Sequence, residues 1–203
     1  REDICTPCRA TLPETNFHLK KENPFTDRFW GRVKLESGAA LFLFAKSNRV
    51  QHLLHNLKYK GQKEVGINLG RRYGYSLKRM AHFADVELIV PVPLHIKKER
   101  IRGYNQSEMF AIGLSESMGI PYAKDALKRV QHSGSQTKQS RMGRLGNVET
   151  VFEIGKAKLL EGKHVLLVDD VLTTGSTLEA CANLILEVPG TKVSMATIAI
   201  ATH

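Results

Sequence analysis

The chain has 203 residues, of which 42% are hydrophobic and 25% charged, the balance of an ordinary folded globule. Its formal charge of +10 and sequence pI of about 9.6 indicate anionic partners, either phosphorylated metabolites or nucleic acid. The sequence shows no membrane-spanning apolar run, no export leader and only three cysteines, too few for a disulfide scaffold. We therefore expect a cytoplasmic protein without membrane insertion, built as one α/β domain with a small appendage.

The first part of the chain contains a short cysteine motif and an irregular segment. Cys5 and Cys8 form a C-x-x-C pair, which supplies half of a tetrahedral zinc site and is a weak signal alone. Residues 13–31 carry prolines, asparagines and a glycine without sustained periodicity. We interpret this segment as a linker with a docked Phe29–Trp30 patch. The two β-prone runs that follow, Arg32–Leu35 and Ala39–Phe44, are joined by Ser-Gly and predict a β-hairpin.

Two amphipathic helices are predicted next. An apolar stripe at Val50, Leu53, Leu54 and Leu57 indicates the first helix, which ends at Lys58-Tyr59-x-Gly61. The second helix should run from Lys63 to about Met80. Apolar residues recur in it at intervals of four, and so do three glycines that would allow close packing against a neighbouring element, namely Gly66, Gly70 and Gly74.

A buried strand at Val86–Val90 is followed by a strongly cationic segment. The chain should leave the sheet at Pro91, because proline cannot donate a hydrogen bond to a neighbouring strand. The basic loop predicted after it contains Lys97, Lys98, Arg100 and Arg102, then Gly103, Tyr104, Asn105 and Gln106. A cationic loop at the carboxyl end of a strand is suited to bind diphosphate, although a generic basic loop would look the same.

The middle of the chain predicts a helix, a short strand and a long polar loop. The helix covers Asn105–Met118 and the strand Leu127–Val130. Residues 131–147 are rich in Ser, Gly, Gln and Arg, and a polar stretch of this length within a compact domain is either disordered or a functional lid.

The most informative stretch is Val165–Thr177, which reads VLLVDDVLTTGST. Four apolar residues predict a strand buried on both faces, and Asp169 and Asp170 stand where that strand should emerge. The next segment is small and rich in hydrogen-bond donors. A helix should begin at Ser176, with Glu179 completing a capping box.

This arrangement predicts a phosphate site beside two carboxylates. Backbone N–H groups and hydroxyls at a helix N-terminus attract phosphate, and Gly175 allows a close approach of the backbone. Two carboxylates would repel an anion unless sugar hydroxyls or a hard cation such as Mg²⁺ lay between them. The alternative, a Walker B strand, lacks its G-x-x-x-x-G-K-[ST] partner in this chain. A last strand is predicted at Val193–Ala201, and Cys181 is predicted to be a small buried residue.

The D-D-x-x-T-T-G-S-T run resembles the phosphoribosyl-diphosphate (PRPP) loop of type I phosphoribosyltransferases. The P-V-P-L-H and R-x-R-G-Y-N-Q runs, the K-x-x-G after Leu57 and the Q-T…R-x-x-N…F spacing around residues 136–152 resemble the ComF competence-protein group. The resemblance implies a mainly parallel central sheet flanked by helices over residues 37–203. Residues 1–36 would be an N-terminal appendage, the remnant of a zinc module whose other cysteine pair would lie upstream of Cys5 and Cys8.

The resemblance also implies a role for each motif. Asp169 and Asp170 would hold the ribose hydroxyls, and the 5′-phosphate would be bound by Thr173, Thr174, Gly175, Ser176 and Thr177. The departing diphosphate would be bound by Arg100, Arg102, Gly103, Tyr104 and Asn105. A flexible lid would contribute Gln136, Lys138, Arg141, Arg144 and Asn147. Mg²⁺ would accompany PRPP, and Zn²⁺ would occupy the cysteine module of the full-length protein.

Two functions therefore compete. The first is transfer of the 5-phosphoribosyl group from PRPP to an unidentified acceptor, with release of diphosphate. The second is a weakly catalytic or non-catalytic role in DNA uptake, with single-stranded DNA or proteins as partners; a nucleotide-sensing regulator is a third reading. Against simple DNA binding, the sequence shows no basic groove interleaved with aromatic residues. The sequence leaves the acceptor and the oligomeric state open.

Overall fold

The computed structural model describes residues 11–45, 49–130 and 151–202. Its centre is a four-stranded sheet with the order β1-β6-β5-β2, in which every pair of neighbouring strands is parallel. The strands are β1 (Gly38–Phe44), β2 (Leu88–Pro91), β5 (His164–Leu172) and β6 (Lys192–Ala201). Because the strands are parallel, their carboxyl ends meet at one edge of the sheet, where ligands bind in open α/β folds.

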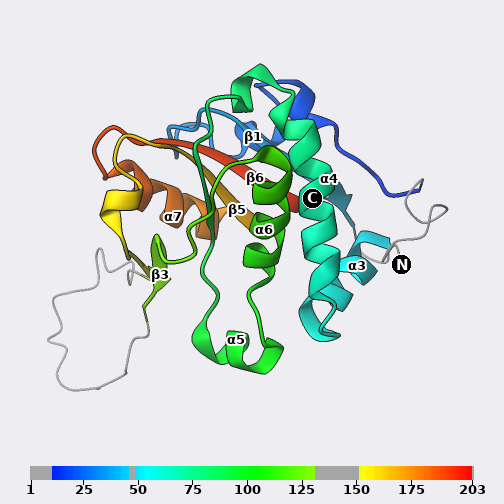
Figure 1. The fold of residues 1–203 in the computed structure, drawn as a ribbon. Helices are drawn as coiled ribbons and strands as arrows, with labels where there is room; N and C mark the ends of the chain where they lie inside the picture. Colours follow the sequence, from blue (N-terminus) through cyan, green and yellow to red (C-terminus); the bar gives the residue numbers. More distant parts are fainter. Residues whose placement is uncertain (1–10, 46–48, 131–150, 203) are drawn as a thin grey trace, which may run out of the picture.

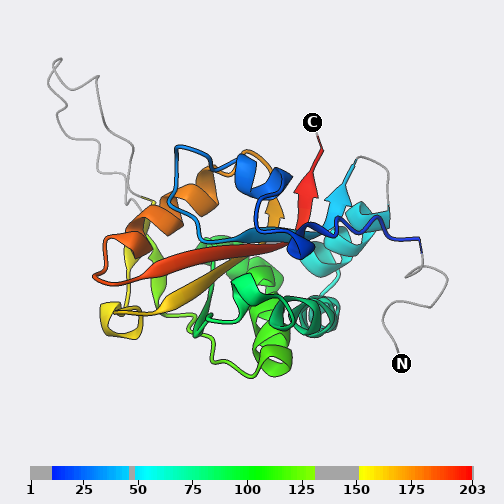
Figure 2. The ribbon, with the colours of Figure 1, turned by 90° about the horizontal axis from the view of Figure 1, so that it is seen from above.

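Helices cover both faces of this sheet (Figures 1 and 2). One face carries α3 (Arg49–Tyr59), α4 (Lys63–Lys78) and α6 (Gln106–Met118), and the other carries α7 (Ser176–Leu186) and the short α2 (Pro24–Asp27). Alternate residues of β5 enter two separate cores: Leu166 and Val168 pack towards α4 and α6, whereas Val165 and Leu167 pack towards α7. All four are fully buried, which confirms the strand predicted to be buried on both faces.

The remaining elements are smaller. A two-stranded antiparallel pair joins β3 (Leu127–Arg129) to β4 (Phe152–Ile154), and α5 (Ile96–Arg102) projects from the body below α6 in Figure 1. Three short 3₁₀ turns complete the fold, at Phe17–Leu19, Ala81–Phe83 and Ala157–Leu159. Among the described residues, no helix is long and apolar enough to cross a bilayer.

The three glycines of α4 are explained by its contact with α6. A Cβ on Gly70 would lie 2.3 Å from the carbonyl oxygen of Phe110, and one on Gly113 of α6 would lie 1.9 Å from that of Ile67. The two helix backbones are therefore closer than any side chain at these positions would permit, which confirms the predicted close packing. This contact fixes α6, and α6 carries the residues that meet the sheet at the functional edge.

The predicted β-hairpin is wrong. Residues 32–35 form no strand, and β1 pairs in parallel with β6, Gly38 lying opposite Met195. The turn between them does not fold back; instead, Glu36 N–H donates to Val193 O at 2.8 Å and Met195 N–H to Ser37 O at 3.0 Å. Pairing with β6 places β1 in the buried sheet, which an isolated surface hairpin would not achieve.

Two other predicted segments have a different local structure. The cationic loop after β2 is the short helix α5, ended by Gly103 in the left-handed conformation at φ 80°. The predicted linker at residues 13–31 contains α2, which begins with a capping box between Asn23 and Thr26. Of the Phe29–Trp30 patch, Phe29 is buried, whereas Trp30 is 85% exposed.

Candidate functional site

The two carboxylates lie on β5 near the carboxyl edge of the sheet, but the strand does not stop at them. It continues to Leu172, and Asp169 pairs in register with Thr197 of β6. Asp169 Oδ1 accepts hydrogen bonds from Ser107 Oγ of α6 and from Asp170 N–H, both at 2.8 Å. Asp170 Oδ2 lies 2.8 Å from Lys58 Nζ at the end of α3. The pair is thus supported from two helices that precede it in sequence.

The environments of the two carboxylates differ. Burial, and next the charge of Asp170, raise the pKa of Asp169 from 3.8 to about 7, against the opposing hydrogen bond from Ser107. Asp170 has the Lys58 ammonium group as its counter-charge. A carboxyl group with so high a pKa lowers the free energy of unfolding whenever it is ionised, as expected where a ligand rather than the protein provides the missing donors.

We expect Asp169→Asn to stabilise the unliganded protein at high pH. The folded state holds the Asp169 proton more tightly than the unfolded chain does. The contribution of Asp169 to the free energy of unfolding is therefore greatest in acid and is lost as the pH rises towards 7. The stability difference between variant and wild type should widen by about 2 kcal/mol between about pH 5 and about pH 8. Urea denaturation at both pH values measures it.

The control for this experiment is Asp125→Asn. Asp125 is exposed, and its hydrogen bond with Lys156 lowers the pKa of its carboxyl group. Its replacement should therefore give no widening of the same sign. A pH-independent effect of Asp169→Asn would contradict the raised pKa.

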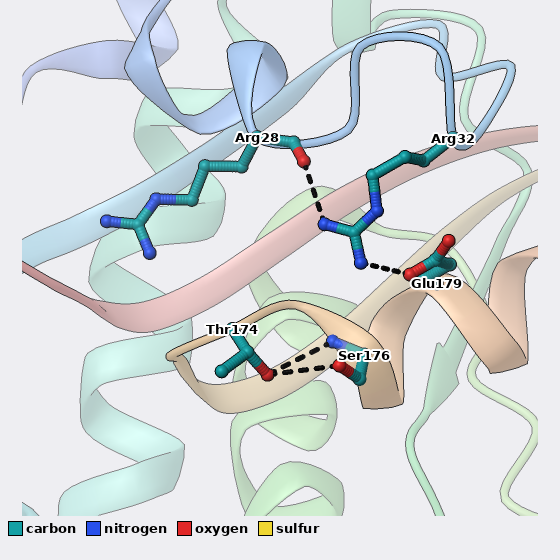
Figure 3. Close-up of polar contacts among 5 residues, drawn as sticks. All are labelled: Arg28, Arg32, Thr174, Ser176 and Glu179. Carbon is teal, nitrogen blue, oxygen red and sulfur yellow. Dashed lines mark hydrogen bonds and ion pairs between the residues drawn. The ribbon is translucent and has the colours of Figure 1, made fainter.

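The predicted phosphate loop, residues 173–177, covers the connection from β5 to α7 and the first two residues of α7. Gly175 is in the left-handed conformation at φ 86°, and its Cα faces the ring of Phe29, where a Cβ would lie 3.2 Å from the nearest ring carbon. Thr174 Oγ1 and Ser176 Oγ are 3.1 Å apart (Figure 3). Glu179 N–H donates to Gly175 O at 2.9 Å, at the start of the hydrogen-bond ladder of α7. The N–H groups earlier in the first turn of α7 come before this ladder and are not used by it.

The capping box predicted for this helix is absent. Gly175 rather than Ser176 is the N-cap, and no side chain caps α7. Glu179 instead pairs with Arg32 (Figure 3). No side chain therefore caps the first turn of α7, an arrangement that suits an anion.

Sequence reasoning missed the segment that holds this loop from the other side. Arg28 donates from Nη1 to Thr173 O and from Nη2 to Ala201 O, both at 2.5 Å. Arg32 donates to Arg28 O at 3.2 Å and reaches Glu179 on α7 (Figure 3). We call Arg28, Phe29 and Arg32 the loop clamp. Two arginines in an irregular segment, about 145 positions before their partners, give no signal in a single sequence.

The predicted diphosphate residues lie beyond the end of β2, near the carboxylates. Arg100 is exposed, and the guanidinium of Arg102 lies over the ring of Tyr59, 5.3 Å from its centroid. Tyr104 donates its hydroxyl to Leu57 O of α3. The side chain of Asn105 is occupied, donating to Val92 O at 2.9 Å and accepting from Ser107 N–H at 3.1 Å, so it joins the end of β2 to the start of α6.

Other predicted residues lie outside the described part of the chain. These are the zinc candidates Cys5 and Cys8 and the lid candidates Gln136, Lys138, Arg141, Arg144 and Asn147. Zinc binding and the lid stay predictions. Within residues 11–45, 49–130 and 151–202, no group of three or more His, Cys, Asp or Glu side chains could hold a metal ion. Cys181 is fully buried, and burial raises the pKa of its thiol.

Comparison with known proteins places this architecture in a family. Residues 105–202 match the phosphoribosyl transferase domain. These residues include α6, β5, the phosphate loop, α7 and β6, which make up most of the edge described above. With its parallel sheet flanked by helices, the chain has the predicted type I phosphoribosyltransferase fold.

Two relatives identify a narrower group within this class of proteins. Competence protein F of Haemophilus influenzae is 33% identical over 137 residues, which cover 66% of this chain and 60% of that protein. DNA utilization protein YhgH of Escherichia coli is 30% identical with the same coverage. The chain belongs to this ComF group of phosphoribosyltransferase-like proteins, and it spans 60% of the length of these two relatives.

A solved structure of similar fold is the glutamine PRPP amidotransferase from B. subtilis complexed with ADP and GMP. It superposes with a TM-score of 0.49 at 21% identity, covering 71% of this chain and 30% of that chain.

Proposed function

We propose that the chain binds PRPP and transfers its 5-phosphoribosyl group to an acceptor, with release of diphosphate. The observation that carries this proposal is the placement of Asp169 and Asp170 five residues or fewer before a loop of hydroxyl side chains and helix N–H groups. A phosphorylated sugar presents both kinds of group, hydroxyls for the carboxylates and a phosphate for the loop. The match to the phosphoribosyl transferase domain over the same residues supports this reading.

Each part of the edge would have one task. The carboxylates of Asp169 and Asp170 would accept hydrogen bonds from the ribose hydroxyls, and their negative charge would offset the positive charge that develops at C1 as the diphosphate leaves. Residues Thr173–Thr177 would bind the 5′-phosphate. The cations of α5, chiefly Arg100 and Arg102, would neutralise the leaving group.

The donor set also fits the metal that the family implies. Carboxylate oxygens are hard ligands of the kind that Mg²⁺ prefers, and Mg²⁺ usually keeps substrate phosphates and water as its other ligands. Two carboxylates would therefore be sufficient, and a dedicated protein cage would not be needed. When bound with PRPP, the ion would supply charge neutralisation of the diphosphate.

We expect the double variant Asp169→Asn, Asp170→Asn to lose PRPP binding. Amides cannot supply the two negative charges or four acceptor sites that the ribose hydroxyls and a magnesium complex require. Calorimetric titration of wild type and variant with PRPP and Mg²⁺ measures the loss, which should exceed about 100-fold in affinity, as for two charge-assisted contacts. Binding retained by the variant, or a variant that no longer folds cooperatively, would contradict the role of the pair.

A second candidate function is binding of single-stranded DNA. It is favoured by α5, which projects from the body with four cations and no buried residue, and by the names of the relatives, a competence protein and a DNA utilization protein. A DNA affinity that falls steeply with salt, and that Arg100→Gln with Arg102→Gln abolishes, would support it. Release of diphosphate from PRPP in the presence of a nucleobase or amine would support the transferase.

A further inference from the structure

A cleft of about 650 Å³ lies at the amino ends of β2 and β5, the edge of the sheet opposite the carboxylate pair. Its volume falls within the range of small-molecule sites. Among the described residues, three segments line it: Glu87 and Leu88 at the start of β2, residues 121–125 after α6, and Lys156, Lys158, Leu159 and Lys163 before β5.

The cleft is separate from the proposed PRPP site. Lys163 of the lining directly precedes β5, and Asp169 is the sixth residue of that strand. At about 3.3 Å per residue, His164 and Asp169 are about 17 Å apart along β5. The turn at Ala157–Leu159, yellow in Figure 1, also lies well away from α5. A small molecule in the cleft would therefore not contact the residues that we assign to PRPP.

Backbone hydrogen bonds fix one wall of the cleft. The segment after α6 runs beside the edge of β2, where Ile89 N–H donates to Pro121 O at 3.0 Å and Ala123 N–H donates to Ile89 O at 2.8 Å. Tyr122, between these two bonds, forms a parallel bridge with Ile89. The Tyr122 side chain is thus carried on backbone that is already ordered, which lowers the entropic cost of binding a ligand there.

The lining carries more positive than negative charge. In the described part of the chain, four lysines stand against two carboxylates, Glu87 and Asp125. Both carboxylates are already paired, since Glu87 Oε1 lies 2.8 Å from Lys163 Nζ and Asp125 Oδ2 lies 3.0 Å from Lys156 Nζ. Two positive charges of the lining therefore have no carboxylate partner within it.

These two charges belong to Lys124 and Lys158. Lys124 Nζ is 3.7 Å from Glu108 Oε1 of α6, which is beyond hydrogen-bonding distance. Lys158 takes part in no salt bridge within the described chain. A phosphate monoester carries about two negative charges at neutral pH, which matches this surplus. Lysine binds phosphate as a point charge, whereas arginine favours planar, bidentate recognition.

Apolar side chains lie in the same cleft. Tyr122 is 37% exposed and Leu159 is 42% exposed, so both present surface to an occupant. An aromatic ring favours a second planar ring as its neighbour. We propose that the cleft binds a nucleotide, whose phosphate pairs with Lys124 and Lys158 and whose base packs against Tyr122 and Leu159. The inference does not depend on transfer of the phosphoribosyl group.

Calorimetric titration with adenosine 3′-phosphate tests the proposal. This nucleotide has no 5′-phosphate for the loop at residues 173–177, and its 3′-phosphate would be repelled by Asp169 and Asp170, so it is a poor ligand for the proposed PRPP site. We expect it to bind wild type at least about 10-fold more tightly than adenosine or inorganic phosphate, as for one charge-assisted contact.

Variants of the lining locate the binding. Lys124→Gln combined with Lys158→Gln should weaken it by at least about 10-fold. Tyr122→Leu should weaken it by about 5-fold through the loss of ring stacking. The matched control is Lys20→Gln combined with Lys78→Gln, which removes the same charge from exposed lysines outside the lining and should leave the affinity unchanged. The affinity for PRPP should be the same in all of these variants.

Several results would overturn the proposal. Adenosine 3′-phosphate might fail to bind at millimolar concentration, or bind equally well after the lining lysines are replaced, and either result would remove the nucleotide from this cleft. Equal losses in the lining and control double variants would show attraction to net charge rather than a site. An oligothymidylate that binds more tightly than the nucleotide, and loses affinity in the lining double variant, would assign the cleft to single-stranded nucleic acid instead.

Discussion

Gly113→Ala is expected to destabilise the protein by about 3 kcal/mol, at the upper end of the range for overpacked cores. The new Cβ would lie 1.9 Å from Ile67 O and 2.7 Å from Arg71 N, and both are backbone atoms that cannot rotate away. Helix propensity alone predicts the opposite sign, a gain of about 1 kcal/mol for replacing glycine by alanine within a helix. The sign of the measured change in stability therefore shows whether helix propensity or the packing of α6 against α4 dominates at this position.

Urea denaturation of wild type, Gly113→Ala and Tyr75→Ala provides the test. Tyr75 is on α4 but is 68% exposed, so its replacement should stay within about 0.5 kcal/mol. If Gly113→Ala folds, the separation of α4 from α6 should also move Ser107 relative to Asp169 and weaken PRPP binding. An unchanged or raised urea midpoint for Gly113→Ala would show that the helices have room for the methyl group.

Arg28→Met is expected to lower the affinity for ribose 5-phosphate and for PRPP by about 10- to 100-fold, a loss comparable with that of one charge-assisted hydrogen bond to the ligand. The guanidinium donates to Thr173 O within the phosphate loop and to Ala201 O at the end of β6, and so fixes the loop relative to the sheet. Arg28→Lys should restore little of the lost affinity, because a single ammonium group lacks the planar guanidinium that reaches two carbonyls at once.

An effect of Arg28 on the position of the phosphate loop can be distinguished from an effect on the stability of the whole protein. Arg79, exposed at the end of α4, is the control, and Arg79→Met should leave both affinities unchanged. Affinity for ribose 5-phosphate should fall in Arg28→Met even at temperatures far below its melting midpoint. Equal affinities for Arg28→Met and wild type would mean that the loop holds its conformation without the loop clamp.

The elements that could be predicted are those whose signal is contiguous in sequence. The strand at 165–168, the glycine-spaced helix α4 and the last strand β6 each carry their pattern within about 16 residues, and each is confirmed. The partner of a strand has no such local signal. Ala39–Phe44 is recognisable as a strand, but its pairing with a segment about 150 positions later is decided by the shared core, and the hairpin prediction failed there.

The same distinction holds within the site. The carboxylates and the hydroxyl loop follow one another directly, so their joint chemistry can be predicted from the sequence. Ser107 contacts Asp169 across 62 positions, and Arg28 contacts Thr173 across 145. Serines and arginines are common on protein surfaces, so only the three-dimensional arrangement distinguishes these two from the others.

The position of β6 has a consequence for synthesis of the chain. The strand lies between β1 and β5, yet it is the last strand of the described chain, so the edge of β1 that faces β6 has no partner until residue 201 has left the ribosome. Until then β1 would expose backbone donors and apolar residues such as Phe42, a combination that promotes aggregation. Completion of the sheet is therefore expected only after translation of β6, and a nascent chain halted before Lys192 should require a chaperone to stay in solution.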